Sequence, residues 1–165
     1  QSPPGVVLVS LALFLTAFIM GPTLEKSYEQ GVAPYVANQI EFEEAFEKTT
    51  APIKLFMIDH VREDDVALFS NIAQDSLPET PEAMSLKILV PAFIISELRR
   101  AFEIGFLIFI PFIIIDLVVA SVLMSMGMMM LPPMMVSLPF KVIFFVLIDG
   151  WQLIAGSLIQ SYGLG

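Results

Sequence analysis

The sequence predicts an all-α fold made of membrane-associated helical hairpins, and three observations support this prediction. Of the 165 residues, 56% are hydrophobic and 15% are charged, and the mean hydropathy of +0.81 is far above that of an ordinary soluble domain. Apolar side chains recur three and four residues apart, which is the spacing of one face of an α-helix. Seven of the ten methionines lie within residues 124–135. We therefore expect helices that hold a methionine-rich loop between them.

The chain divides into three predicted segments: 1–24, 25–84 and 85–165. The first is expected to be an apolar helix. Its uncharged run, residues 6–20, has fifteen residues before Gly21 and Pro22 interrupt it. A membrane span needs about 20 apolar residues, so this run is short for a span. The chain does not begin with Met, and we expect that an upstream segment such as a targeting segment has been removed or is missing.

Residues 25–84 are predicted to form an acidic, helical segment on the non-cytoplasmic side. From Glu25 to Glu82 there are 13 acidic and 4 basic residues, which account for the whole net charge of −9. Cytoplasmic loops tend to be rich in Lys and Arg, so an acidic segment favours the opposite side. Nucleic acid and anionic lipid both require a basic patch, and the charge argues against both as partners.

Apolar residues at helical spacing indicate short amphipathic helices within the acidic segment. Thr50 and Pro52 predict the start of one of these helices, because they are typical of a first helical turn. Two aromatic residues on the apolar stripe, Phe56 and Phe69, are expected to contact neighbouring subunits.

Residues 85–165 are predicted to form an apolar helical hairpin with the methionine-rich loop at its turn. The incoming helix is expected to end near Met130, because Pro132 and Pro133 together cannot continue a helix. Methionine side chains are flexible and polarizable and can close around objects of different shape. The residues alone leave three roles open for the cluster: hydrophobic packing, a deformable seal or peptide-contact surface, and a Cu(I) site.

Four charged residues in this apolar part are candidates for buried charges that hold subunits together: Glu97, Asp116, Lys141 and Asp149. An intramembrane carboxylate such as Asp116 can be a proton or cation relay, or it can form a structural ion pair, for which Lys141 offers a partner. In a straight hairpin closed at the two prolines, Asp116 lies level with Asp149. Lys141 then lies about 12 Å nearer the turn, at a rise of about 1.5 Å per residue. We therefore expect Lys141 to bind a carboxylate of a neighbouring copy.

The sequence argues against an enzyme, a cofactor and a metal site built on histidine or cysteine. The single histidine, His60, lies near several acidic residues but lacks a set of convergent ligands, and a packing or surface role is expected for it. There is no Gly-x-Ser-x-Gly elbow and no glycine-rich phosphate loop after a strand. The chain contains no cysteine, which excludes disulfides and thiolate chemistry.

Residues 11–20, 109–133, 137–142 and 149–153 resemble the FliP family of the bacterial flagellar type III export gate, whose injectisome counterpart is SctR. The resemblance extends over nearly the whole chain. It implies a subunit of a helical hetero-oligomeric gate, in which several copies join FliQ and FliR around a channel for unfolded flagellar subunits. It also implies a location in the bacterial inner membrane at the flagellar basal body, with the acidic segment on the periplasmic side. The implied gasket at the pore constriction consists of Met126, Met128, Met129 and Met130.

The predicted function is therefore that of a channel-forming subunit that passes unfolded polypeptide and closes when idle. Two other functions stay open. One is a methionine-lined copper permease, which copper binding would support. The other is a membrane scaffold whose acidic segment binds a partner protein, which capture of a periplasmic protein by the isolated segment would support.

Overall fold

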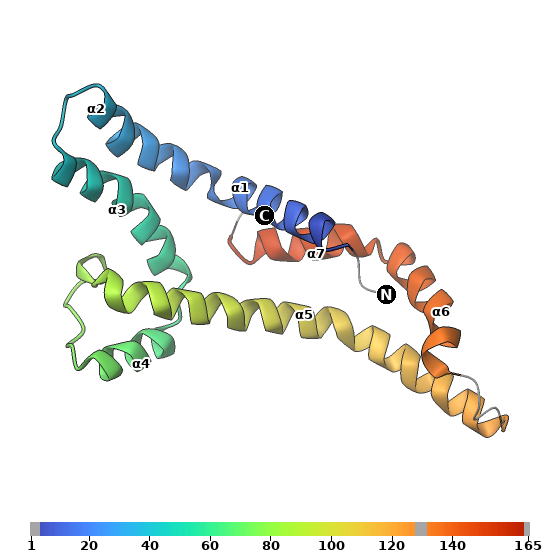
Figure 1. Ribbon diagram of the computed structural model, residues 1–165. Coiled ribbons are helices and arrows are strands. Elements are labelled where there is room, and N and C mark those ends of the chain that lie inside the picture. The colour runs from blue at the N-terminus through green and yellow to red at the C-terminus, as the bar shows by residue number, and fades with distance from the viewer. Residues whose placement is uncertain (1–3, 128–131, 164–165) are drawn as a thin grey trace. The chain divides into compact units, whose positions relative to one another are not determined.

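The structure is a computed structural model that describes residues 4–127 and 132–163, and these residues form helices and turns with no strand among them (Figure 1). The predicted all-α fold class is confirmed. The helical elements, in chain order, are α1 (Gly5–Ser27), the π-helix η1 (Tyr28–Val32), α2 (Ala33–Val36), α3 (Phe42–His60), α4 (Glu63–Ala73), the 3-10 helix η2 (Pro81–Ala83), α5 (Leu86–Ser125), α6 (Pro133–Leu147) and α7 (Gly150–Gln160).

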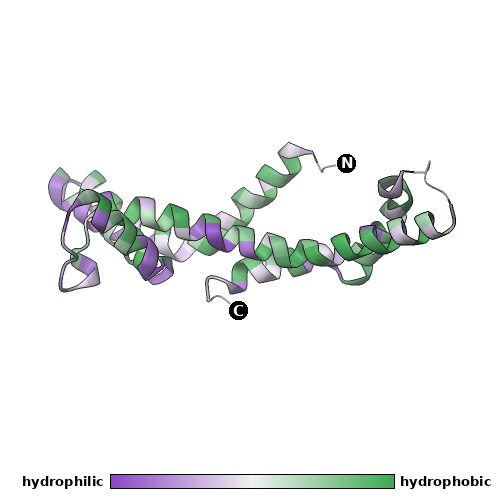
Figure 2. Ribbon diagram, turned by 90° about the horizontal axis from the view of Figure 1, so that it is seen from below, coloured by the Kyte–Doolittle hydropathy of each residue, from purple (hydrophilic) through white to green (hydrophobic). Residues whose placement is uncertain are grey.

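Within residues 4–127 and 132–163, two helical stretches are long and apolar enough to cross a membrane. They are Gly5–Val36, which runs through α1, η1 and α2, and Leu86–Ser125, which is α5. Helices α6 and α7 pass the same test only as a pair bent by 57°, which has the geometry of a broken span or of a re-entrant loop. Hydrophobic residues dominate much of the ribbon in Figure 2, whereas hydrophilic residues gather toward its left-hand end. This distribution fits the predicted membrane association.

The chain forms two compact units, residues 1–100 and residues 101–165. Helix α5 contributes its first part to one unit and its last part to the other. The first unit contains the acidic segment, and the second contains the methionine-rich turn.

In the first unit, the helix that contains the first apolar run does not end at Gly21 and Pro22. Helix α1 contains Pro22 and continues to Ser27, and η1 and α2 extend it to Val36. A proline inside a helix removes one backbone hydrogen bond, and neighbouring packing can offset this loss. The turn after α2 is closed by Asn38 in the left-handed conformation, where the Asn38 N–H donates to the Tyr35 carbonyl.

The predicted helix start at Thr50 and Pro52 is wrong, because α3 begins eight residues earlier, at Phe42. Two acidic residues in the first turn, Glu43 and Glu44, favour this start because they face the positive end of the helix dipole. The Thr50 hydroxyl donates to the Phe46 carbonyl within the helix at 2.8 Å. Pro52 is buried in the helix interior. Packing of the apolar face therefore outweighs the local start signal at Thr50 and Pro52.

The core of the first unit lies where α3, α4 and the beginning of α5 meet. Its buried side chains are Met57, Val66, Met84, Ile88, Leu89 and Ala92. Half-buried residues, among them Phe69 and Phe93, pack around this cluster. Of the apolar residues on the two helices, Ile53 and Ile58 of α3 and Phe69 and Ala73 of α4 pack against this core.

A polar network joins α4 to α5 beside that core. The carboxylate of Asp65 is buried, and it accepts a hydrogen bond from the Ser96 hydroxyl at 2.7 Å and one from the Arg99 guanidinium at 2.9 Å. The Arg62 N–H donates to the same Ser96 oxygen at 3.0 Å. Arg100 donates to the carbonyl of His60, the last residue of α3, at 3.0 Å. These bonds fix the end of α3 and the start of α4 on the surface of α5.

Candidate functional site

The candidate site is the methionine turn, residues 124–135, together with the hairpin that carries it. Helix α5 ends at Ser125, and Gly127 follows in the left-handed conformation with φ of +74°. The Gly127 N–H donates to the Met124 carbonyl, a common way to close a helix. Pro133 is the first residue of α6, where a proline costs no hydrogen bond.

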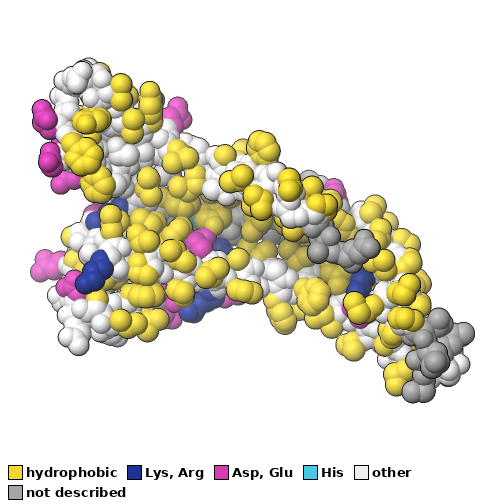
Figure 3. Space-filling view, viewed as in Figure 1, with side chains coloured by type: hydrophobic (Ala, Val, Ile, Leu, Met, Phe, Trp, Pro, Cys, Tyr) yellow, Lys and Arg dark blue, Asp and Glu magenta, His cyan; other side chains and the backbone are white. Residues whose placement is uncertain are grey.

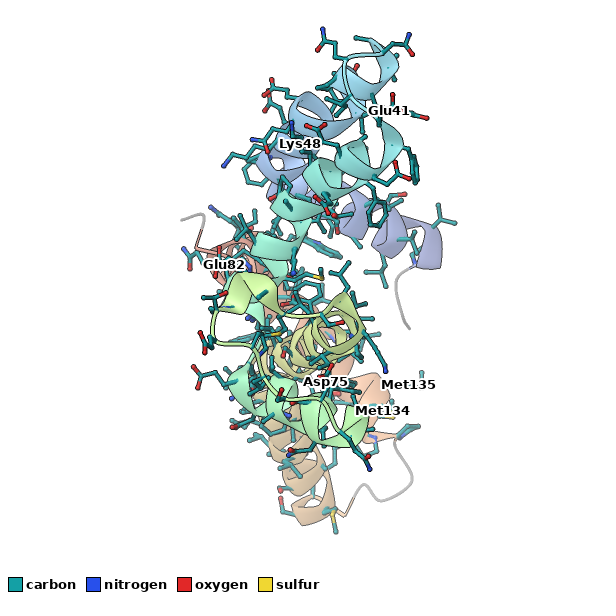
Figure 4. All side chains as sticks on the ribbon, turned by 90° about the vertical axis from the view of Figure 1, so that its left-hand side faces the viewer. Glu41, Lys48, Asp75, Glu82, Met134 and Met135 are labelled. Atoms are coloured by element: carbon teal, nitrogen blue, oxygen red, sulfur yellow. The ribbon has the colours of Figure 1, made fainter. Side chains whose placement is uncertain are left out.

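The expected helix end near Met130 is therefore wrong. Glycine can adopt a positive φ without steric cost, so Gly127 ends the helix before the two prolines do. The described methionines of the turn are all exposed: Met124, Met126, Met134 and Met135. Figure 4 shows the last two at the start of α6. The other predicted gasket residues, Met128, Met129 and Met130, lie outside the described residues.

One ion pair closes the hairpin behind the methionine turn. The Lys141 ammonium lies 2.7 Å from Oδ1 of Asp116, and the side chains of Lys141 and Asp116 are 23% and 35% exposed. The hydroxyl of Ser137, which is fully buried, donates to the same oxygen at 2.7 Å. Four residues before Asp116, Phe112 makes an edge-to-face contact with Phe144. A carboxylate from α5 thus holds two polar groups from α6 within an apolar hairpin.

The prediction that Lys141 binds a neighbouring copy is corrected, because its partner is Asp116 of the same chain. The reason lies in the turn. Asp116 is nine residues before the end of α5 and Lys141 is eight residues after the start of α6, so the two side chains lie at one level. A hairpin centred on the prolines would have placed Asp149 there instead. The earlier end of α5 shifts the register.

The two other predicted charged residues lie elsewhere. Asp149 is exposed and has a left-handed conformation with φ of 53°, between α6 and α7. Glu97 pairs with Arg100 one turn further along α5 at 2.8 Å, as their spacing allows. A role of these charges in assembly stays a prediction.

The two predicted subunit-contact residues lie against the chain's own helices. Phe56 is half-buried, and its ring contacts the rings of His60 and Phe93. Phe69 packs against the core of the first unit. Contact of either residue with another subunit stays a prediction.

His60 lies in a packing position. Its ring stacks on Phe56 with centroids 4.4 Å apart, and its Nδ1 lies 2.7 Å from the Phe56 carbonyl oxygen. Within residues 4–127 and 132–163, no group of three or more His, Cys, Asp or Glu side chains could hold a metal ion.

Sequence reasoning did not single out Ser137 or the Asp65 network. A signal for each was present in the spacing. Ser137 precedes Lys141 by four residues and Ser96 precedes Arg99 by three, so each pair shares a helix face. Buried polar groups need hydrogen-bond partners. A serine hydroxyl beside a basic side chain on an apolar helix therefore indicates that both groups bind one buried carboxylate.

An apolar groove flanks the hairpin. It has a volume of about 420 Å³ and is lined by residues of α5 and α6, including Val119, Val122 and Phe140. Among the residues that the structure describes, those that line it are all apolar. The groove offers a surface to hydrophobic groups and none to a polar ligand.

A family model and several similar known proteins agree with one another. A model of the FliP family matches residues 1–158. The flagellar biosynthetic protein FliP of Caulobacter vibrioides is 60% identical over 165 residues, which are 100% of this chain and 62% of that protein. The protein of the same name from Bacillus subtilis is 58% identical over 160 residues, 97% of this chain and 72% of the relative. The one from Pectobacterium carotovorum is 52% identical over 161 residues, 98% of this chain and 62% of the relative. The chain thus spans between 62% and 72% of the length of these three relatives.

Proposed function

The chain belongs to the FliP family, and from this we propose that it is a subunit of the flagellar protein export apparatus. Several copies join FliQ and FliR subunits around a channel that passes unfolded flagellar subunits across the bacterial inner membrane. The observation that carries this proposal is the family match over residues 1–158. The role is that of a structural and transport subunit without enzymatic chemistry or a cofactor.

The methionine turn is the proposed seal of this channel. Its described methionines are exposed at the end of a hairpin whose register is fixed by Asp116, Ser137 and Lys141. A rigid hairpin can bring flexible thioethers from several copies to one place, where they close the channel and rearrange around a passing chain. In this proposal the gasket residues are Met126, Met128, Met129 and Met130.

The acidic segment lies on the periplasmic side in this proposal. The two candidate spans, Gly5–Val36 and Leu86–Ser125, flank a stretch that holds most of the chain's acidic residues. Positively charged loops tend to stay in the cytoplasm, and this stretch has the opposite charge. The assembly sits at the flagellar basal body.

A chimera tests the proposed function. This chain replaces the matching residues of C. vibrioides FliP in cells that lack their own FliP. We expect restored export of flagellar subunits and swimming, and FliQ and FliR should purify together with the chimera. The control is the same C. vibrioides protein with these residues deleted, which should restore neither. A chimera that inserts in the membrane at the normal level but does not associate with FliQ or FliR would contradict the proposal.

A further inference from the structure

An exposed aromatic patch lies in the acidic segment, away from the methionine turn in the sequence. It consists of Tyr35 of α2 and Phe42 and Phe46 of α3, which are 45%, 60% and 54% exposed. The rings contact one another, because the Tyr35 and Phe42 centroids are 6.2 Å apart and those of Phe42 and Phe46 are 6.3 Å apart. Aromatic side chains bring large apolar areas, and contiguous exposed ones mark interaction surfaces.

Close packing and backbone hydrogen bonds position the elements that carry the patch. Helix α3 packs tightly on η1, where a Cβ on Gly31 would lie 2.6 Å from the Thr49 nitrogen and 2.9 Å from the Ala45 carbonyl oxygen. The turn between α2 and α3 is closed by two backbone bonds, from Asn38 to Tyr35 and from Gln39 to Pro34. Rigid aromatic rings lose little conformational freedom on binding, and such residues often dominate the energy of an interface.

Carboxylates surround this patch. Four glutamates lie on and just before the first two turns of α3: Glu41, Glu43, Glu44 and Glu47. Glu44 is paired with Lys48 at 2.6 Å, and no ion pair is found for the other three in the described part of the chain. Figure 3 shows acidic side chains in magenta beside hydrophobic ones in yellow at the upper left, over α2 and α3, and Figure 4 shows Glu41 and Lys48 there.

The charge selects among possible occupants. An anionic membrane surface is repelled by the glutamates, and a second copy in a symmetric contact would bring its own glutamates to the same place. A partner with Lys or Arg around an apolar anchor satisfies both the rings and the carboxylates. We propose that Tyr35, Phe42 and Phe46 with their surrounding glutamates form a docking site for an amphipathic helix of another protein, one whose apolar stripe is flanked by Lys and Arg.

Peptide binding to the full chain in detergent tests this proposal. The probe is a fluorescent 14-residue helix of Leu and Lys, and its counterpart has Glu in place of every Lys. We expect the Leu/Lys helix to bind in a salt-dependent manner and the Leu/Glu helix not to bind. Phe42→Ser with Phe46→Ser should weaken binding at least about tenfold, because these rings form the apolar contact.

The chain offers a matched aromatic control. Phe14 and Phe18 of α1 are also four residues apart and are 77% and 64% exposed, but no acidic residue lies within that apolar run. Phe14→Ser with Phe18→Ser should leave binding unchanged. An equal loss in both double variants, or no loss in Phe42→Ser with Phe46→Ser, would overturn the proposal.

A second pair of variants tests the charges. Glu41→Gln, Glu43→Gln and Glu47→Gln together should remove most of the salt dependence, whereas Glu79→Gln with Glu82→Gln should not. Binding of the Leu/Glu helix with equal affinity would overturn the charge argument. Loss of self-association or of binding to anionic vesicles in the Phe42 and Phe46 variant, with peptide binding intact, would assign the patch to a second copy or to lipid instead.

Discussion

Asp116 is the residue on which the register of the hairpin depends. Its Oδ1 accepts from both Lys141 and Ser137, so one oxygen joins two successive turns of α6 to α5. A charge deep in a bilayer is costly unless it is paired, which makes the paired register favourable over any shifted one. The pair therefore determines which residues of α5 and α6 lie at the methionine turn.

Asp116→Ala should destabilise this hairpin, because it leaves the Lys141 ammonium unpaired. An unpaired Lys at the centre of a membrane helix costs about 2.5 to 3.5 kcal/mol, and we expect the lower end because both side chains are partly exposed. Unfolding by sodium dodecyl sulfate, followed by fluorescence of Trp151, the only tryptophan, measures the change.

The matching control removes both charges. Asp116→Leu with Lys141→Met should recover most of the stability, because apolar replacement of an ion pair is often neutral. Wild-type stability of Asp116→Ala would contradict the role of the pair. Lost export by an assembled double variant would favour the proton-relay interpretation of Asp116.

Asp65→Ala should loosen α4, because Ser96 and Arg99 lose a shared acceptor. Loss of an acceptor for buried donors lowers the free energy of unfolding by about 1 to 3 kcal/mol. Hydrogen exchange in Glu63–Ala73 should accelerate by the corresponding factor. Asp64→Ala is the control, because Asp64 is exposed in the same turn and should lose only the contribution of its charge to the helix start, about 0.3 to 1 kcal/mol. Equal exchange rates in both variants would count against this role of the network.

At the scale of elements, the contact of η1 with α3 depends on a glycine. A Cβ on Gly31 would clash with the backbone of Thr49 and Ala45, so Gly31→Ala should destabilise this pairing by about 1 to 3 kcal/mol. Gly21→Ala in α1 is the control, because no atom lies within 4 Å of its added Cβ and alanine favours the helix. Thermal unfolding in detergent compares the two. A loss of stability in the Gly21 variant alone would contradict the close packing.

The helices themselves could be predicted from the sequence, but several of their ends could not. Apolar runs and helical spacing indicate that α1, α3, α5 and α6 exist. Thr50 and Pro52 gave a wrong start because a proline inside a helix costs one bond, which burial of Pro52 can offset. Gly127 was not recognised as the residue that ends α5. This error gave the wrong register for the hairpin and therefore the wrong partner for Lys141. Lys141 was considered as a partner for Asp116 but was assigned to a neighbouring copy, because the position of the turn set the wrong register.

An apolar stripe does not tell a subunit interface from a core. Phe56 and Phe69 were assigned to subunit contacts from their stripe, and the structure shows both half-buried against their own unit. A helix buries the same apolar face whether the opposing surface belongs to its own chain or to another. The aromatic patch at Phe42 and Phe46 is exposed, and only the structure distinguishes it from the stripe beside it.

For the molecule as a whole, charge and hydropathy divide the chain between two environments. Most acidic residues lie between the two candidate spans, and the chain has no cysteine. Glu43→Cys therefore introduces a single thiol at an exposed position. A membrane-impermeant thiol reagent should label it in cells whose outer membrane is opened. Labelling that requires opening of the cytoplasmic face would contradict the periplasmic location.

Ion permeability of membranes that contain the assembled complex tests most directly whether the methionine turn seals a channel. Met128→Ala, Met129→Ala and Met130→Ala together should let small ions pass while the complex still assembles, because alanine cannot fill the space that the long thioethers fill. Met20→Ala in α1 is the control and should leave permeability unchanged. We predict a leak in the triple variant only. An assembled triple variant with the ion permeability of the unaltered complex would contradict the seal.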